Sequence, residues 1–554
     1  MTEVLQVTGQ PHLDKVILPE HDHELTSEQS NVFEIERLPF ELLQTVLEDL
    51  DTARDLLAVT QINKHLRDSG ISNPKLWASP DLSCSPELVK LFLRRSESVP
   101  LRFRVPVTVI SRLDVSNIVQ TILAELPRTE YLEIPLIHPS PQSSAFISIL
   151  KTPAPSLRAL HLSCALCHIG SAKRKAAPYS LLHDRDCLST AVCFPEPHLF
   201  GQLSPSLIEI DFRIPLSSSH FECIRQSLGN LVHLTLLSCQ TGTKFSPGLK
   251  ILLTMLQQAS HLETLFLGGC FPDGNPGEVL PTTTLHKLRE IGLCDASDEQ
   301  ICEFIRYLQM PKLKTVNINS TQPVHPESMV SGFEYLRTIS CSLQNPISRL
   351  QLRLETVREG GRWSHIAVLN TTAISGVGRR CPQTLSASSM WTNNSEYESR
   401  PILDNILEVT TECFNLSSLD ILMVEAIQYT VAIELEDILP RSIQTSWLTS
   451  LHASGSFVPP ILFILCGEGA VQVPFPSLEH LYLEEVDIVD SGSEYILILA
   501  LEYRAGLGRL IKSLVLKSCL KIKDPFLTRL QELLPQGVTV LDGEGSGCPL
   551  LGCA

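Results

Sequence analysis

A short apolar pattern recurs along most of this 554-residue chain: Leu-x-x-Leu-x-Leu, in which Ile, Val or Phe can replace Leu. The clearest copies are PSLRALHLSCA (155–165), PSLIEIDFR (205–213), NLVHLTLLSCQ (230–240), SHLETLFLGGC (260–270), HKLREIGLCDA (286–296), PKLKTVNINST (311–321), LSSLDILMVEA (416–426), PSLEHLYLEEV (476–486) and IKSLVLKSC (511–519). Alternate residues of a β-strand point to the same face, so apolar positions two residues apart predict a strand with one buried face. Each copy is therefore expected to form one short strand.

The spacing of the copies indicates a stack of similar units. The leading leucines of four consecutive copies are Leu231, Leu262, Leu288 and Leu313, which are separated by 31, 26 and 25 residues. The stretches between strands, such as residues 246–260 and 297–310, carry apolar residues three or four apart, which is typical of helices. A strand, a loop and a helix repeated at roughly 20–29 residues is the period of leucine-rich repeats.

We therefore predict an α/β fold in which residues 81–554 form an irregular leucine-rich-repeat solenoid. Stacking of such units gives a curved array whose strands line one side. Two segments, at about 166–204 and 371–400, interrupt the pattern, and the second is rich in Ser and Asn. We expect both to be long loops inserted into the array.

The composition excludes several classes of function. Hydrophobic residues make up 43% of the chain, and 44 Lys and Arg stand against 61 Asp and Glu, which gives a net charge of −17. An acidic chain repels phosphate backbones, so we expect no nucleic-acid partner. The longest apolar runs fall far short of the ~20 residues that cross a bilayer, so we expect no membrane insertion.

The sequence also predicts a cellular compartment. Its first residues, MTEVLQVTGQPHLDKV, lack the basic and apolar regions of a secretory signal. The 17 cysteines are an odd number without such a signal, which favours reduced thiols over a disulfide framework. We therefore expect a cytoplasmic or nuclear protein, or one found in both places, and not a secreted one.

The amino-terminal part of the chain differs from the repeats. Residues 1–32 are acidic and without periodicity, so we expect a disordered tail. After it, residues 38–50 place apolar side chains on one stripe of a helix, and a second helix is predicted over residues 53–68, ended by Gly70. Helices this short need packing partners, so this unit is expected to cap the repeats or to dock on another protein.

The same segment resembles an F-box. The matching motifs are LPFELL (38–43), VLEDL (46–50), RDLLAV (54–59), INKHLRD (62–68) and PKLW (74–77). Residues 81–105 are similar to the segment directly after the F-box in many fungal F-box/leucine-rich-repeat proteins. One departure is Leu66, where the family usually carries an aromatic residue. The resemblance assigns residues 33–80 to the F-box.

The resemblance implies a function without catalysis in this chain. An F-box docks on the Skp-family adaptor, and through it on the cullin, of an SCF-type ubiquitin ligase, while the repeats bind a protein substrate. The residues that would contact the adaptor or support the contact are Leu38, Pro39, Leu42, Val46, Leu47, Leu50, Leu56, Leu57 and Ile62. Candidate substrate-binding residues, at the variable positions of the strands, are Arg158, His161, Glu209, Asp211, His233, Glu263, Phe266, Arg289 and Asn317.

Two other classes of function remain open at this point. The chain could be a scaffold whose repeats hold a stable protein partner without promoting ubiquitination. An enzyme has no positive support, because the sequence contains no Gly-x-Ser-x-Gly, Walker-type or His-Glu-x-x-His motif.

One cysteine cluster could suggest a cofactor. Cys164-Ala-Leu-Cys167-His168 has the spacing of a haem attachment site, and a zinc interpretation would add His183, Cys187 and Cys193. The spacing does not form two tight pairs. Cysteines also follow other repeat strands, at Cys239, Cys270 and Cys519. We therefore interpret them as small buried side chains and predict no metal or other cofactor.

Overall fold

A computed structural model shows that the chain divides into two compact units, residues 1–76 and 77–554. The structure describes residues 38–50, 53–106, 115–136, 141–164, 206–214, 216, 221, 224–225, 227–238, 248–271, 280–320, 334–340, 347–359, 362–373, 383–393, 410, 419, 421–427, 448–455, 457–467, 473–485, 492–519, 522 and 524–541. The predicted tail at 1–32 and the predicted insertion at 166–204 lie outside these residues.

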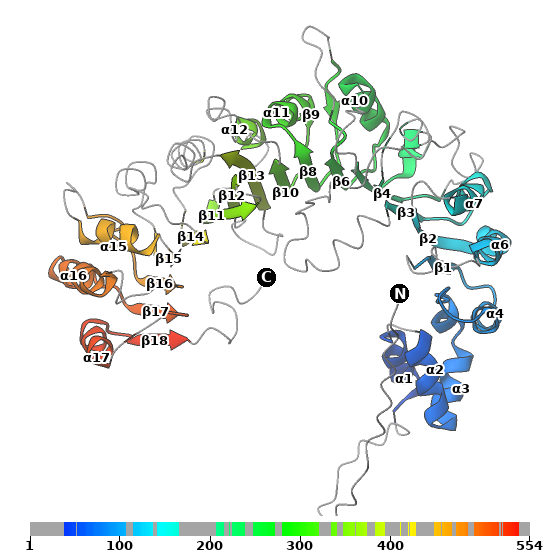
Figure 1. The fold of residues 1–554 in the computed structure, drawn as a ribbon, viewed down its shortest axis with the longest axis horizontal. Coiled ribbons are helices and arrows are strands. Elements are labelled where there is room, and N and C mark those ends of the chain that lie inside the picture. The colour runs from blue at the N-terminus through cyan, green and yellow to red at the C-terminus, as the bar shows by residue number, and fades with distance from the viewer. Residues whose placement is uncertain are drawn as a thin grey trace, which may run out of the picture. The chain divides into compact units, whose positions relative to one another are not determined.

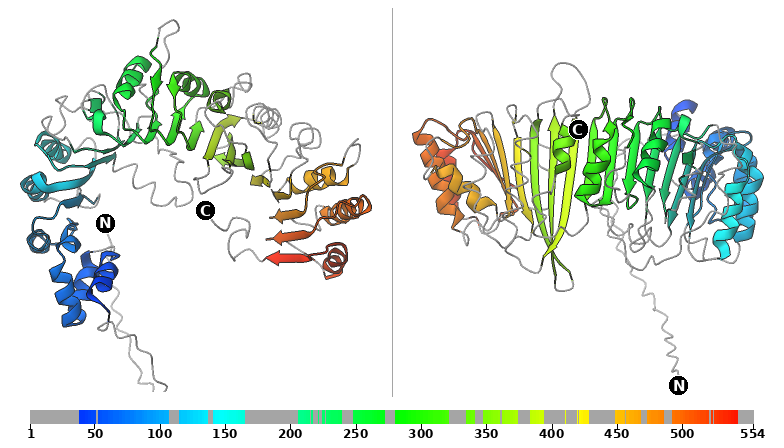
Figure 2. Two further views of the ribbon diagram at one scale, coloured as in Figure 1. Left: turned by 180° about the vertical axis from the view of Figure 1, so that it is seen from behind. Right: turned by 90° about the horizontal axis from the view of Figure 1, so that it is seen from above.

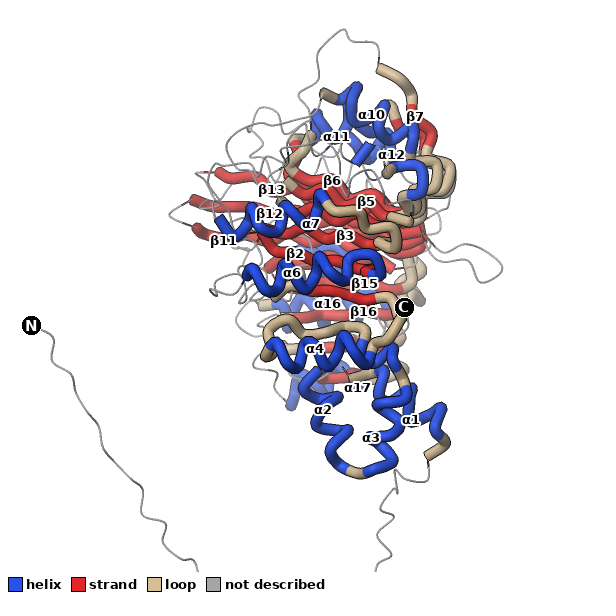
Figure 3. Tube along the Cα trace, turned by 90° about the vertical axis from the view of Figure 1, so that its right-hand side faces the viewer, coloured by secondary structure: helices blue, strands red, loops and turns tan. Residues whose placement is uncertain are grey.

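The first unit consists of three short helices, α1 (Phe40–Glu48), α2 (Ala53–Ile62) and α3 (Lys64–Ser72), which are labelled in Figure 3. Helix α3 packs against both α1 and α2. The cluster at the centre is small, with three fully buried apolar side chains among the described residues: Leu43, Leu47 and Leu66. Leu66, the departure from the F-box pattern, is thus a core residue of this unit.

The prediction of one continuous helix over residues 53–68 was wrong. The helix breaks at Asn63, whose extended backbone and side-chain oxygen cap a new helix by accepting the Leu66 N–H at 2.8 Å. Gly70 does not end this helix either, because α3 continues to Ser72. A Cβ atom at Gly70 would lie 2.6 Å from Cγ2 of Thr60, so the glycine permits the close approach of α2 and α3.

The second unit is an α/β structure built on one large sheet. Sixteen strands of the described residues form it in the order β1-β2-β3-β4-β5-β6-β8-β10-β13-β12-β11-β14-β15-β16-β17-β18. The strands outside the β11–β13 segment are β1 (Leu101–Arg104), β2 (Thr129–Leu136), β3 (Ala159–Cys164), β4 (Glu209–Arg213), β5 (His233–Leu237), β6 (Thr264–Gly268), β8 (Glu290–Ala296), β10 (Thr315–Ser320), β14 (Ile421–Ile427), β15 (Ser450–Gly455), β16 (His480–Glu484), β17 (Ser513–Lys517) and β18 (Val538–Leu541).

All nine predicted strands are present, and each pairs in parallel with a neighbour in the sheet. Their pattern leucines face the core: Leu234, Leu236, Leu265 and Leu267 are fully buried. Helices α10 (Leu249–Gln258) and α11 (Asp298–Arg306) confirm the two helices predicted between strands. The α/β class is therefore correct.

The described helices of this unit lie along one face of the sheet (Figures 1 and 2). They are α4 (Pro86–Arg95), α6 (Val115–Glu125), α7 (Pro141–Lys151), α10, α11, α12 (Glu334–Ser340), α15 (Val458–Cys466), α16 (Ser493–Gly506) and α17 (Asp524–Leu533). A short second sheet pairs β7 (Thr283–Thr284) with β9 (Leu308–Gln309). No helix in the described part of the chain combines the length and the apolarity needed to cross a membrane.

One segment interrupts the parallel order. Strands β11 (Ile347–Glu359), β12 (Arg362–Ala373) and β13 (Gln383–Asn393) pair antiparallel with one another. Strand β13 then pairs in parallel with β10, and β11 with β14, so the segment is inserted into the sheet. The expected loop at 371–400 therefore contains the end of β12 and all of β13. The expectation of a loop there was wrong, because the polar composition of this segment hid β13 and the end of β12.

The chain makes a similar turn after several of the parallel strands. Each of these strands has two core-facing residues two positions apart, and the residue two positions after the later one has a positive φ. These residues are Gly269, Asp295, Gly455, Glu485 and Ser518. The next residue at two of these turns is a cysteine. The thiol of Cys270 donates to the carbonyl of Leu236 at 3.7 Å, and that of Cys519 to the carbonyl of Leu483 at 3.5 Å. These cysteines therefore link a turn to the preceding strand, while Cys239 lies outside the described residues.

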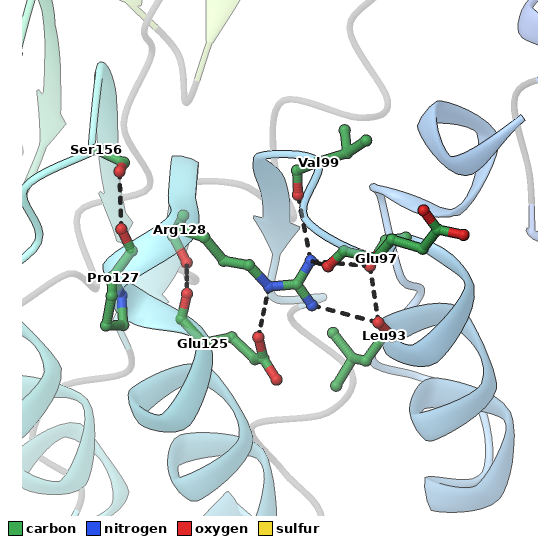
Figure 4. Close-up of polar contacts among 9 residues, drawn as sticks. Leu93, Glu97, Val99, Glu125, Pro127, Arg128 and Ser156 are labelled. Atoms are coloured by element: carbon green, nitrogen blue, oxygen red, sulfur yellow. Dashed lines mark hydrogen bonds and ion pairs between the residues drawn. The ribbon is translucent and has the colours of Figure 1, made fainter.

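An arginine ties together the start of this unit (Figure 4). Arg128 ends the 3₁₀ turn that precedes β2, and its Nη1 donates to the carbonyls of Glu97 at 2.7 Å and Val99 at 3.2 Å. Nη2 donates to the carbonyl of Leu93 at 3.3 Å, and Nε pairs with Glu125 at 2.6 Å. One side chain thus holds the end of α4, the loop before β1 and the end of α6.

Candidate interaction surfaces

The first candidate surface is an apolar stripe on helix α1. Leu42 is 54% exposed and Val46 is 57% exposed. Together with exposed Pro39 they are spaced three and four residues apart, so they lie on one side of the helix. Leu43 and Leu47, the next residues along, are buried in the small core. Leucine and valine side chains contribute no hydrophobic stabilisation while they are exposed to water, so this stripe is a candidate contact surface.

The nine predicted adaptor-contact residues fall into three groups. Pro39, Leu42, Val46 and Ile62 are exposed, and Leu38, Leu50 and Leu57 are half-buried. Leu47 and Leu56 are buried, so in this structure they can support a contact but not make one. Sequence reasoning missed two exposed apolar side chains of the same unit, Phe40 and Ile71. Phe40 belongs to the LPFELL motif and could have been found there.

The second candidate surface is the sheet face opposite the helices, which we call the open face. Strand register places its side chains in two rows. The first row is Tyr131, Ala159, Glu209, His233, Thr264, Glu290 and Thr315. The second row is Glu133, His161, Asp211, Thr235, Phe266, Gly292 and Asn317. Unlike the leucines between them, most of these residues are polar and half-buried.

The structure brings six of the nine predicted substrate-binding residues onto the open face: His161, Glu209, Asp211, His233, Phe266 and Asn317. The other three lie one position before their strands, at the edge of the sheet. Arg158 there pairs with Glu130 at 3.7 Å, and Arg289 pairs with Glu263 at 3.5 Å. These edge residues bridge neighbouring strands, and such exposed pairs contribute little to stability.

A chain of polar contacts crosses strands β1 to β4 on the open face. Arg104 Nε lies 2.7 Å from Glu133 Oε2, which also accepts the Tyr131 hydroxyl at 2.8 Å. His161 then joins Tyr131, at 3.3 Å from Nδ1, to Glu209, at 3.0 Å from Nε2. Burial, followed by the Glu133 contact, raises the pKa of Tyr131 to about 12. The hydrogen bond from His161 lowers the pKa of Glu209.

A second polar group occupies the open face of the last strands. His452, with a side chain 7% exposed, has Nε2 at 3.1 Å from Glu484 Oε2. The other carboxylate oxygen of Glu484 lies 2.5 Å from Lys517 Nζ. Sequence reasoning could not find this group, because nothing in the sequence states which strands become neighbours.

Phe266 and Glu290 occupy the middle of the open face. A Cβ atom at Gly292 would lie 2.0 Å from Cδ1 of Phe266, so the ring of Phe266 lies across the bare backbone of the next strand. Glu290 is two residues before Gly292 and accepts from Asn317 Nδ2 at 3.4 Å, a long hydrogen bond. Desolvation raises the pKa of Glu290, and the charge of nearby His233 opposes this effect.

Of the cysteine cluster singled out in the sequence, only Cys164 lies within the described residues, where it is buried at the end of β3. No protein-family model matches the chain, and no curated protein matches it.

Proposed function

We propose that this chain is the substrate-recognition subunit of an SCF-type cullin-RING ubiquitin ligase. In this proposal the first unit is an F-box that docks on the Skp-family adaptor. The second unit is an irregular leucine-rich-repeat solenoid whose open face binds a protein substrate. The chain itself performs no chemical step.

The exposed stripe on α1 carries the proposal. Its residues belong to the LPFELL and VLEDL motifs that resemble an F-box, and the three-helix core leaves the apolar side chains of Pro39, Leu42 and Val46 exposed. An amphipathic helix with an unburied apolar side is suited to a groove or helix of a partner protein. A buried arrangement of Leu42 and Val46 would have removed this support.

The strand order supports the proposal for the second unit. Strands β1 to β6, then β8 and β10, are sequential neighbours in parallel, and the described helices between them, α6, α7, α10 and α11, lie on one side of the sheet. This is the order that stacked strand–helix units produce. The Leu-x-x-Leu-x-Leu-x-x-Cys sequence at 262–270 also matches the leucine-rich-repeat pattern, in which Asn or Cys occupies the last position.

The proposed mechanism is tethering. A substrate bound to the repeats is held near the ubiquitin-carrying enzyme of the same complex. For a short flexible connection, this raises the effective concentration of substrate lysines to the order of millimolar.

The proposal is tested by copurification of the full chain with a Skp-family adaptor. The double variant Leu42→Asp/Val46→Asp should lose binding, because it places two charges in the apolar contact. Gln44→Glu is the control and should bind as the unaltered chain does, because Gln44 is two positions from both Leu42 and Val46 and therefore lies on the opposite side of the same helix. If the unaltered chain does not bind the adaptor, the proposal is wrong.

A scaffold would also bind its partner, so turnover separates the two functions. A substrate captured through the open face should accumulate in cells that carry the Leu42→Asp/Val46→Asp variant. A partner whose half-life is unaffected by this variant would indicate a scaffold.

A further inference from the structure

Carboxylates on the open face are matched by cations on the same or the neighbouring strand, with one exception among the described residues. Glu133 pairs with Arg104, and Asp211 pairs with Arg213 at 3.0 Å. Glu209 pairs with His161, and Glu484 pairs with both Lys517 and His452. The fold thus compensates the charge of these side chains internally.

Glu290 is the exception among the described side chains. It is half-buried at the centre of the sheet, its register neighbours are Thr264 and Thr315, and its one hydrogen bond comes from the neutral amide of Asn317. The charge of His233, two strands away in the same row, opposes the desolvation of Glu290, but His233 forms no ion pair with it. A carboxylate that is partly removed from water and has no paired cation among the described side chains loses hydration that is only partly replaced. Such a position is unfavourable for the isolated chain, which points to a partner that supplies the missing charge.

The surroundings of Glu290 define the shape of that partner. Phe266 is diagonal to Glu290 across strands β6 and β8, a separation within reach of long side chains. Gly292 is the residue that lets the Phe266 ring lie flat at this place. An aromatic ring beside a carboxylate suits a long cationic side chain, whose stem packs on the ring and whose head meets the charge.

We propose that Glu290, with Phe266 beside it, receives a lysine or arginine side chain of a polypeptide that binds the open face. The net charge of −17 is complementary to such a basic segment and would accelerate its association. Thr264, Thr315 and Asn317 around the carboxylate offer polar contacts to the peptide backbone. The inference rests on the proposed function in assigning the open face to the substrate, and it adds the class of substrate: a segment with an exposed basic residue.

The test uses the purified full chain without adaptor and four pools of fluorescent peptides. The pools are identical in composition except for a central Lys, Arg, Ala or Glu. We expect the Lys and Arg pools to bind about tenfold more tightly than the Ala pool, with the Glu pool weakest. Glu290→Gln keeps the size and the acceptor for Asn317, and it should abolish the preference. Phe266→Leu should weaken binding of the Lys and Arg pools about two- to fivefold.

Glu479→Gln is the matched control. It removes the same charge from the edge of strand β16, where Glu479 pairs with Lys512, and should leave the preference intact. Equal binding of all pools, absence of binding by any pool, or a basic preference that persists in Glu290→Gln would each overturn the inference. Because no adaptor is present, failure of the F-box proposal does not affect this result. A chain that binds basic peptides but no adaptor would refute the ligase function alone.

Discussion

His161 Nε2 lies 3.0 Å from Oε1 of Glu209 on the neighbouring strand, and this contact lowers the pKa of the Glu209 carboxyl. A carboxyl whose folded-state pKa is depressed contributes stability above its unfolded value, and that contribution disappears as pH falls through the folded-state pKa. The open face is therefore held together in part by a contact that acid removes.

Glu209→Gln should consequently destabilise the second unit at neutral pH but not in acid. We expect the free energy of unfolding to fall by less than about 1 kcal/mol at neutral pH, because the pair is partly exposed. Thermal unfolding followed across the acidic range would measure the difference between variant and unaltered chain. That difference should shrink as pH falls below 4.5, the ordinary pKa of the carboxyl. A difference that grows on acidification would contradict the assignment.

The contact of Phe266 with Gly292 predicts a coupled pair of substitutions. Gly292→Ala places a methyl group where the ring lies, so we expect destabilisation of about 1–3 kcal/mol. Phe266→Ala removes the ring and makes room for that methyl group. In chemical denaturation the double variant should therefore be more stable than the sum of the two single changes predicts. Strict additivity would show that the ring can move aside without strain.

We expect the loss of the Arg504 side chain to lower the free energy of unfolding more than any of the other single substitutions. Arg504 is fully buried in helix α16 and donates to the carbonyls of Pro474 at 2.8 Å, Phe475 at 2.9 Å and Leu478 at 3.4 Å. Burial lowers its pKa to about 10, so it remains a cation at neutral pH. Arg504→Met leaves these carbonyls without their donor and should reduce the free energy of unfolding by about 2–5 kcal/mol.

Arg509→Met is a useful comparison for that experiment. Arg509 lies in the loop after the same helix and is exposed, so its removal should change stability little. Equal effects of the two substitutions in chemical denaturation would contradict the structural role of Arg504.

The sequence predicted those parts of the fold that depend on local pattern. The alternation of leucines located nine strands, because burying one side of a strand requires that spacing whatever its neighbours are. The β11–β13 insertion was missed although β11 carries the same alternation at Leu350, Leu352 and Leu354, because that pattern does not show that a strand pairs antiparallel with the next one. On helix α1 the pattern identified Leu42 and Leu47 equally well. Only the packing of α3 decides that Leu47 is buried and Leu42 is exposed.

The candidate sites divide in the same way. Variable positions of the strands correctly located six residues on the open face. Their partners could not be predicted, because the contact of His161 with Glu209 joins residues 48 positions apart in the sequence. The intervening segment 166–204 changes the spacing between repeats, so register could not be extrapolated from one strand to the next. Glu290 was missed for a related reason: that no cation among the described side chains pairs with it is visible only when its neighbouring strands are known.

The thiol of Cys270 provides a test of the turns that come after the strands. It is fully buried, and burial raises its pKa to about 12, so almost no thiolate forms at neutral pH. We expect Cys270 to resist alkylation in the native chain and to react once the chain is unfolded in denaturant. Mass spectrometry of peptides after brief treatment with iodoacetamide would measure this, with half-buried Cys84 as the internal comparison. Because the thiol also bonds the preceding strand, rapid native labelling of Cys270 would mean that this turn opens readily.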